Sequence, residues 1–400
     1  MRVALKASPD PQRLFPAAAE APPPALLAPT GPDVVLGDRS SPDGLPLPVA
    51  PSADSLFGPR GACLAAEDGP LWVADSGHHR LLGWRGLPRA DNAPADWVIG
   101  QPDFVREGRN AKGPPGPATL NVPTGLVAGA NGLIVADAWN HRVLIWHALP
   151  EDSHVPADLV LGQADFAGGE ANRGRGEAGA ETLNWPYGVA TDGERLIVAD
   201  TGNRRVLIWD AMPQSNGQPA DRVLGQVAFD RRDENAGHAP DAMSLRWPHD
   251  VVLHEGALFV ADAGNNRVMV WRDLPETPGA PCDLVLGQGD FSATDHNRSH
   301  YWPDATCLNM PYGLSVAGSW LLVADTASSR LLGWPIDALT TGGPALALTG
   351  QPDFQSKGDN RWQAAVRDSL CWPYAVKACG ETVVVADSGN NRVLVWRLAA

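Results

Sequence analysis

Six copies of one short motif recur along this 400-residue chain. Each copy is an apolar run ending in Ala-Asp, then a four-residue turn, an arginine and a second apolar run ending in Trp. Successive aspartates are 62 or 63 residues apart, at Asp75, Asp137, Asp200, Asp262, Asp325 and Asp387. A Gly-Gln pair keeps the same spacing, at residues 100–101, 162–163, 225–226, 287–288 and 350–351. Two motifs in one phase predict a repeat architecture.

Each unit predicts four short strands. Apolar runs such as residues 196–199 and 206–209 do not alternate with polar residues, which indicates strands buried on both faces. Turn residues such as 201–203 separate the runs too closely for helices. A sheet that is apolar on both faces needs a neighbour on each side, and a ring of six sheets supplies one.

The two ends of the chain complement one another. Residues 393–398 match a third strand with no fourth strand after it, and residues 32–37 match a fourth strand with no unit before it. Pairing them would complete the last sheet and remove free edges. We therefore predict an all-β fold, a six-bladed β-propeller of four-stranded antiparallel blades over residues 31–400, closed by an N-terminal strand. The Pro- and Ala-rich residues 1–30 are expected to form a mobile arm.

The repeat resembles the NHL repeat, on the segments VADTGNRRVLIW, VADAGNNRVMVW and VADSGNNRVLVW. The resemblance covers residues 57–400 in all six units. Unit 1 departs from it at His78 and His79, and unit 5 departs at Ser328 and Ser329. The family implies a six-bladed β-propeller. It includes RNA-binding, protein-binding and enzymatic members, so the resemblance by itself implies no single function.

Composition narrows the classes of partner. Lys and Arg number 31 against 46 Asp and Glu, a formal net charge of −15, which argues against nucleic acid and anionic membranes as partners. Arginines in the long loops alternate with acidic residues, which also disfavours a phosphate track. No run of 18 apolar residues occurs. Five cysteines without a CxxC pair indicate reduced thiols in a cytoplasmic protein, with no disulfide framework and no cysteine zinc site. A monomer is expected.

The repeated polar residues predict structure and not a site, because six equal copies cannot all form one site. Asp200 is expected to accept hydrogen bonds from turn N–H groups and from Arg205, as a buried bracket. The Trp that ends each third strand and the Phe after each Gly-Gln are expected to be packing anchors. Function should lie where the units differ.

The first strand of each unit begins at a proline, and the residue after that proline is expected at the mouth of the central channel. This position carries Arg60, Thr124, Tyr187, His249, Tyr312 and Tyr374. The residue before the proline is Val122, Trp185, Trp247, Met310 and Trp372 in units 2 to 6. These side chains predict an aromatic cup with a few polar groups, typical of a pocket for a small molecule or peptide. The alternative is an aromatic plug that keeps water out of the axis.

Two functions remain open at this point. The first is a non-catalytic binding or scaffold module without metal or cofactor, taking a protein segment or small molecule through Arg60, Thr124, Tyr187, His249, Tyr312, Tyr374, Trp185, Trp247 and Trp372. The second is an enzyme of the metal-dependent lyase or hydrolase type, with His249 as base or ligand and Arg60 as anion anchor. Some propeller lyases of similar fold hold zinc with three histidines, and only His249 matches such a position.

Overall fold

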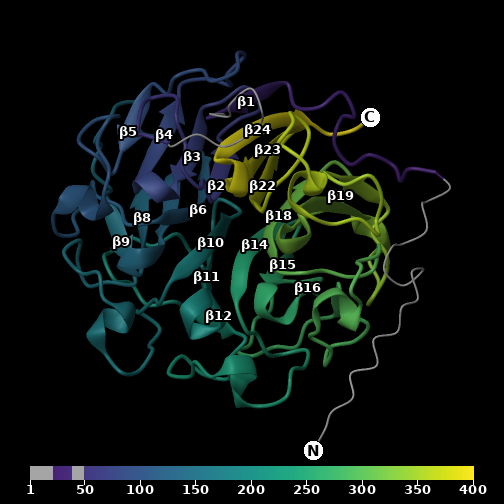
Figure 1. The fold of residues 1–400 in the computed structure, drawn as a ribbon. Helices are drawn as coiled ribbons and strands as arrows, with labels where there is room; N and C mark the ends of the chain where they lie inside the picture. The colour runs from purple at the N-terminus through teal and green to yellow at the C-terminus, as the bar shows by residue number, and fades with distance from the viewer. Residues whose placement is uncertain (1–20, 38–48) are drawn as a thin grey trace, which may run out of the picture.

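The computed structural model describes residues 21–37 and 49–400. In these residues the chain forms six four-stranded antiparallel sheets arranged as the blades of a propeller (Figure 1). The six-bladed fold predicted from the repeat is therefore confirmed. Long polar connections join one blade to the next.

Blades 1 to 3 use consecutive strands. Their bounds are β2 (Gly61–Leu64), β3 (Leu71–Asp75), β4 (Arg80–Trp84), β5 (Trp97–Ile99), β6 (Pro123–Gly129), β7 (Gly132–Asp137), β8 (Arg142–Trp146), β9 (Leu159–Leu161), β10 (Pro186–Thr191), β11 (Leu196–Asp200), β12 (Arg205–Trp209) and β13 (Arg222–Leu224). Blades 4 and 5 comprise β14 (Pro248–His254), β15 (Ala257–Asp262), β16 (Arg267–Trp271), β17 (Leu284–Leu286), β18 (Pro311–Ala317), β19 (Trp320–Asp325), β20 (Arg330–Pro335) and β21 (Ala347–Thr349). Blade 6 comprises β22 (Pro373–Cys379), β23 (Thr382–Asp387), β24 (Arg392–Arg397) and β1 (Val34–Leu36).

The first strand of every blade lies nearest the axis. In Figure 1 β2, β6, β10, β14, β18 and β22 surround the centre, and each of them contacts the first strand of both neighbouring blades. The apolar core lies between adjacent sheets, because each sheet buries both faces. One cluster, for example, joins Val73 of blade 1 to Val384 of blade 6.

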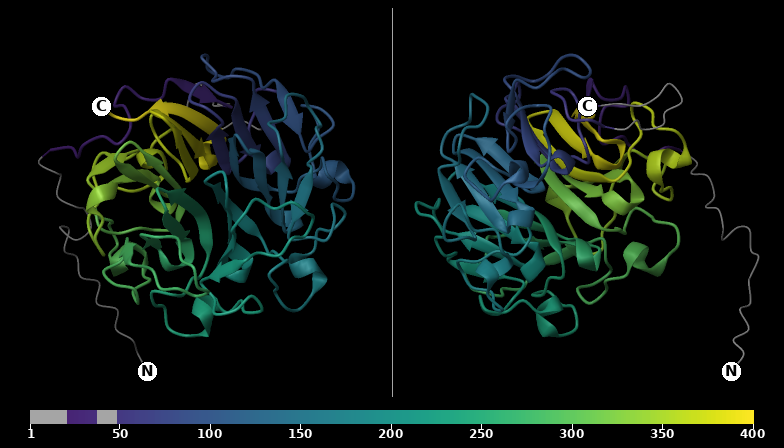
Figure 2. Two further views of the ribbon diagram at one scale, coloured as in Figure 1. Left: turned by 180° about the vertical axis from the view of Figure 1, so that it is seen from behind. Right: turned by 60° about the vertical axis from the view of Figure 1, so that its left-hand side comes forward.

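The ring is closed by pairing between the two ends of the chain. β1 runs antiparallel to β24, with Val34 opposite Val395 and Leu36 opposite Val393. In Figure 1 and in the turned views of Figure 2 the purple N-terminal strand lies beside the yellow C-terminal blade. The predicted closure is therefore confirmed.

Residues 21–30 belong to the folded ring and not to the mobile arm expected over residues 1–30. Leu26 and Leu27 are each 1% exposed. The Trp396 indole N–H donates to the Ala28 carbonyl at 2.8 Å. In blades 1 to 5 the equivalent Trp donates to a carbonyl nine residues further along, in the loop before the fourth strand. Residues 21–30 thus supply this loop for blade 6, while residues 1–20 lie outside the described residues.

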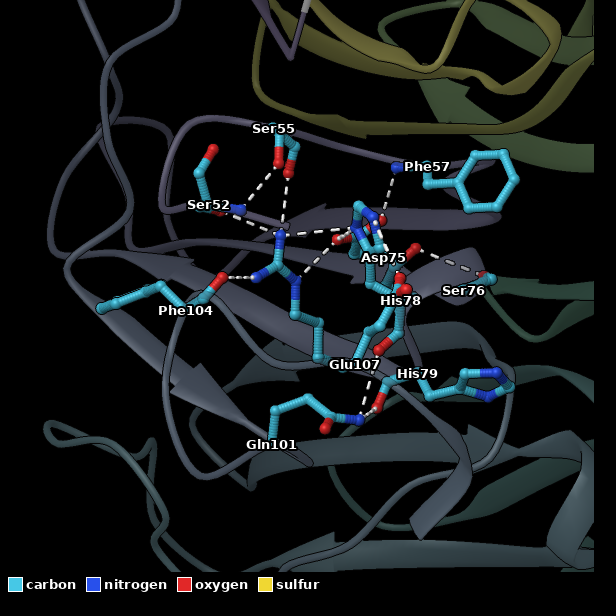
Figure 3. Close-up of polar contacts among 12 residues, drawn as sticks. Ser52, Ser55, Phe57, Asp75, Ser76, His78, His79, Gln101, Phe104 and Glu107 are labelled. Atoms are coloured by element: carbon cyan, nitrogen blue, oxygen red, sulfur yellow. Dashed lines mark hydrogen bonds and ion pairs between the residues drawn. The ribbon is translucent and has the colours of Figure 1, made fainter. Parts of the chain in front are cut away.

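The repeated Asp and Arg form the predicted bracket, shown for blade 1 in Figure 3. Arg80 Nε donates to Asp75 Oδ2 at 2.7 Å, and the Phe57 backbone N–H donates to Asp75 Oδ1 at 2.7 Å. Arg80 Nη1 donates to the Phe104 carbonyl at 2.7 Å. The same Nε–Oδ2 bond is 2.7–2.9 Å in all six blades, with side chains at most 2% exposed. Each bracket ties two strands to the loops around them.

Short 3-10 helices mark the end of the ring that carries the channel mouth. One set connects the second and third strands: η1 (Ser76–His78), η3 (Ala138–Asn140), η5 (Thr201–Asn203), η7 (Ala263–Asn265), η9 (Thr326–Ser328) and η12 (Ser388–Asn390). A second set lies in the long loops between blades: η2 (Arg109–Lys112), η4 (Ala171–Gly174), η6 (Glu234–Gly237), η8 (His296–Ser299) and η11 (Asp359–Trp362). A further short helix, η10 (Ile336–Ala338), connects β20 to β21 and so lies at the opposite end of the ring. Paired amides such as Asn110 with Asn140, at 2.7 and 3.1 Å, join the two sets. None of the helices in the described ranges is long and apolar enough to cross a membrane.

All five cysteines lie in the described residues and all are free thiols. Cys63, Cys282 and Cys307 are buried, and burial raises the pKa of the Cys63 and Cys282 thiols to about 12. These groups are neutral, unreactive core residues at neutral pH.

Candidate binding site at the channel mouth

Four aromatic side chains from four blades meet at the mouth of the channel. The Tyr187 ring centroid lies 4.5 Å from that of His249, and His249 stacks on Tyr312 at 4.0 Å with an interplanar angle of 2°. Tyr312 continues the row to Tyr374 at 4.8 Å. Each residue follows the proline that begins its innermost strand, so one repeat position places all four beside the axis.

Arg60 closes this row into a ring. Its Nη1 donates to the Tyr187 hydroxyl at 2.6 Å, and its guanidinium carbon lies 5.1 Å from the centre of the Tyr374 ring. Thr124 holds the sixth position but is fully buried, and its hydroxyl donates to the Tyr187 carbonyl at 3.0 Å. We call Arg60, Tyr187, His249, Tyr312 and Tyr374 the floor of the site.

The floor is neutral except for Arg60. His249 is 9% exposed, and its Nδ1 lies 3.1 Å from the Trp247 carbonyl, an arrangement in which Nδ1 is the donor. Burial lowers the pKa of His249 to about 4; the positive charge of Arg60 adds to this effect, and the bond to Trp247 opposes it. Burial also raises the pKa of Tyr187. At neutral pH the imidazole is therefore uncharged and the Tyr187 phenol is protonated.

Four exposed tryptophans stand around the floor. Trp185, Trp247 and Trp372, which precede the prolines of blades 3, 4 and 6, are 41%, 40% and 50% exposed. Trp139, in the turn before β8, is 46% exposed. The Trp185 ring meets Tyr187 edge-on at 6.0 Å, which links these residues to the floor. We call the four tryptophans the rim.

The backbone at the rim is held in an unusual conformation by the neighbouring blade. Trp185 and Trp372 have φ of 57° and 51°, in the left-handed region that large residues rarely occupy. The Trp185 N–H donates to His141 Nδ1 at 3.0 Å, and the Trp372 N–H donates to Ser329 Oγ at 3.2 Å. Burial lowers the pKa of His141, which keeps its Nδ1 lone pair available as an acceptor. The turn of one blade therefore positions the rim residue of the next.

Blade 3 breaks this pattern. His79, His141, Asn266, Ser329 and Asn391 all accept a backbone N–H from the following blade. Arg204 occupies the same position in blade 3, and a guanidinium has no acceptor. Its Nη1 donates instead to the carbonyls of Gly202 and Arg232, at 3.0 and 3.3 Å. Trp247, the residue that Arg204 would otherwise hold, is not among the residues with positive φ.

Floor and rim enclose two adjoining cavities. The first has a volume of about 600 Å³ and is lined by Arg60, Trp139, Asn184, Trp185, Tyr187, Thr201, Gly202, Arg204, Arg232, Trp247, His249, Tyr312 and Tyr374. The second, of about 470 Å³, shares Arg60, Trp139 and Tyr374 with the first and adds Trp372. We call the two cavities together the bowl. A volume of this size suits a small molecule or a few residues of a peptide.

The structure thus brings together eight of the nine residues predicted for the site, and Thr124 is the one that turns away into the interior. The two alternatives predicted for these aromatic residues, a binding cup and a plug of the axis, each describe part of the arrangement. The floor rings contact one another and are largely buried, as in a plug, whereas the rim indoles are exposed, as in a cup. In the described ranges no group of three or more His, Cys, Asp or Glu residues is arranged to hold a metal ion.

Sequence reasoning missed Trp139 and Arg204. Both break the repeat within the turn between the second and third strands, where the other units carry Gly or Ala in place of Trp139 and His, Asn or Ser in place of Arg204. The difference between units that revealed the floor lies at the proline position, several residues away from this turn. The same comparison, extended to the turn, would have found both.

These features define a six-bladed β-propeller built from NHL-type repeats. No family model matches the chain. It is a distant homologue, over half its length, of NHL repeat-containing protein 2: it is 28% identical to the protein from Bos taurus over 222 residues and 27% identical to that from Homo sapiens over 219. The matched region covers 50% of this chain but only 28% and 27% of those proteins. The resemblance stated from the motif is confirmed.

A solved structure shares the architecture. A structural genomics protein of unknown function from Bacteroides thetaiotaomicron aligns with a TM-score of 0.52 at 13% identity, covering 92% of this chain and 75% of that one. At this identity the likeness concerns the fold alone.

Proposed function

We propose that this protein is a non-catalytic binding module whose bowl receives a small molecule or a segment of another protein. The observation that carries the proposal is the rim: four indoles, each 40–50% exposed, gathered around two adjoining cavities of about 600 and 470 Å³. Scattered exposed apolar residues are ordinary on a protein surface, but a contiguous group around a hollow is typical of a binding site.

The chemistry of the rim supports recognition. Tryptophan presents a large rigid face that loses little conformational freedom on binding, and it is enriched among the residues that dominate interface energies. Holding Trp185 and Trp372 in left-handed backbone conformations is unfavourable for folding, and their side chains remain half in solvent. Val122 and Met310 share this backbone at the same repeat position, so the conformation belongs to the repeat, and the large exposed indole is what distinguishes Trp185 and Trp372.

The floor favours binding over catalysis at His249. The imidazole is stacked on Tyr312, donates to a backbone carbonyl and has a pKa near 4. A general base works best when its pKa lies near the operating pH, so this ring is a weak base at neutral pH. The stacked and hydrogen-bonded imidazole is better suited to form a flat, neutral surface of the binding site. The expected cytoplasmic location and monomeric state stay predictions.

The experiment replaces rim residues and leaves the floor intact. Trp185→Ala with Trp372→Ala should change folding stability little, because both side chains are half exposed, yet should weaken ligands at least about tenfold. Trp362→Ala is the matched control, since Trp362 is 71% exposed and lines neither cavity. Binding of a panel of small aromatic compounds and short peptides is followed by ligand-observed NMR. Ligands that bind the double variant as well as the wild type would contradict the proposal.

A further inference from the structure

The bowl has a charge opposite to that of the whole protein. The chain carries a formal net charge of −15, yet the residues lining the two cavities include Arg60, Arg204 and Arg232 and no Asp or Glu. Two acidic side chains near this end of the axis are already paired. Glu234 binds Arg246 at 2.7 Å, and Asp250 binds Lys377 at 2.8 Å. The three arginines therefore dominate the local field.

The lining arginines keep hydrogen-bonding capacity for a ligand. Among the described residues no carboxylate lies within ion-pair distance of Arg60, Arg204 or Arg232. Arg204 Nε is buried without a hydrogen-bond partner, and the bonds of this guanidinium run from Nη1 to two carbonyls. Arg60 uses Nη1 for the Tyr187 hydroxyl. A guanidinium has five N–H donors, so both groups have donors left to offer.

The presence of Arg204 also runs against the repeat. Every other blade places an acceptor at this position and binds the backbone N–H of the residue that precedes the next blade's proline. Such a bond contributes to stability, so replacing the acceptor with a cation gives up a structural contact. The replacement brings a positive charge into the lining of the cavity. A ligand that needs that charge explains the exchange.

We propose that the bowl selects a carboxylate joined to an aromatic or apolar body, with Arg204 and Arg60 binding the carboxylate and the rim indoles covering the body. This inference rests on the proposed function of the bowl. Planar guanidinium groups match the geometry of a carboxylate and can bind it through two parallel hydrogen bonds. The ligand is either a free small acid or the C-terminal residue of a peptide, since both present the same chemistry.

Aromatic sites often bind cations instead, through the negative faces of the rings. Here the face of Tyr374 is already occupied by the Arg60 guanidinium at 5.1 Å, and the face of Trp247 by Arg246 at 5.4 Å. An ammonium ligand would meet the Arg60 charge without a carboxylate to offset it, whereas Glu234 already offsets the charge of Arg246. The arrangement therefore favours an anion over a cation.

The test uses three probes of one shape: 3-phenylpropanoate, 3-phenylpropanamide and 3-phenylpropylamine, which carry charges of −1, 0 and +1. We expect the carboxylate to bind the wild-type protein about tenfold more tightly than the amide, and the amine to bind most weakly. Arg204→Gln should remove most of the carboxylate's advantage and leave the amide unchanged within about twofold. Arg231→Gln is the matched control, because Arg231 lines neither cavity. Raising the salt concentration should reduce the preference.

The outcomes separate this inference from the proposed function. Equal binding of the three probes, lost in the Trp185→Ala and Trp372→Ala variant, would overturn the charge selection and leave the binding module in place. A preference that persists in Arg204→Gln and Arg60→Gln would also overturn the selection. If none of the probes binds in a way that depends on the rim, both proposals are refuted. Acetyl-Gly-Phe with a free or amidated end then distinguishes a chain terminus from a free acid, by whether the peptide carboxylate binds more tightly than 3-phenylpropanoate.

Discussion

Leu26→Ala tests whether residues 21–30 form part of the ring. The side chain is 1% exposed, and its backbone bonds Leu348 at 3.1 Å and Ala399 at 3.0 Å. Truncating a fully buried leucine removes its transfer free energy and leaves a cavity, which together destabilise by about 2–5 kcal/mol. Leu346→Ala is the control, because Leu346 is 48% exposed and should change stability by less than about 0.5 kcal/mol. Urea unfolding followed by tryptophan fluorescence measures both.

A second substitution makes this prediction specific to one contact. Leu26 packs over Gly333 in β20, where an added Cβ would lie 2.5 Å from Leu26 Cδ1. Gly333→Ala should therefore destabilise the wild-type protein, and should do so less in the Leu26→Ala variant, where that atom is absent. We expect a coupling free energy of about 1 kcal/mol or more between the two sites. If Leu26→Ala unfolds at the same urea concentration as the wild type, or if the two changes are additive, the packing described for residues 21–30 is wrong.

Three further outcomes are expected. Asp200→Ala should destabilise by about 3–5 kcal/mol in urea unfolding, because it leaves a buried arginine unpaired, whereas Asp103→Ala, at an exposed ion pair, should cost under about 1 kcal/mol. The His249 pKa of about 4 lies below the 6.5 of a free imidazole, so the unfolded chain binds more protons than the folded chain between these pH values. The free energy of unfolding should therefore fall by about 3 kcal/mol from pH 7 to pH 4. His249→Phe should remove that part of the pH dependence. His141→Ala removes the acceptor of the Trp185 N–H and should lower the unfolding free energy by about 1–2 kcal/mol, detectable in urea.

Much of the fold could be predicted because the same motif occurs six times with a nearly constant spacing. The spacing of Asp200 and its equivalents fixed the length of a blade, and the apolar runs around it indicated strands buried on both faces. The closure followed from an unmatched fourth strand at residues 32–37. Each of these inferences depends on order along the chain, which a periodic sequence displays directly.

Residues 21–30 could not be predicted in the same way. Proline and alanine are typical of a flexible linker, and Leu26 and Leu27 have no counterpart in the repeat motifs. Their burial depends on β21 and β24, which lie more than 300 residues away in the chain. Composition describes a segment by itself, whereas this segment is held by a surface that exists only when the ring is complete.

The burial of individual side chains at the mouth could not be predicted from the sequence either. Tyr187 and Trp185 are two residues apart, yet one is 9% exposed and the other 41%. Tyr187 packs against His249 of the next blade, whereas Trp185 has a left-handed backbone held by His141 of the preceding blade, and its side chain stays half exposed. Sequence position placed both at the mouth, but the packing of Tyr187 against the ring of a neighbouring blade exists only in the assembled propeller.

Closure of the ring by β1 and β24 has a consequence for biosynthesis. The ribosome makes Val34 first, and it makes the partner Val395 only after the 360 residues that separate the two. At roughly 5–20 residues per second, the first strand waits roughly 20–70 s for the strand beside it. Throughout that interval the apolar residues of β1, with Leu26 and Leu27, lack the partners that bury them. The last blade is thus completed only after the other five blades have been synthesised.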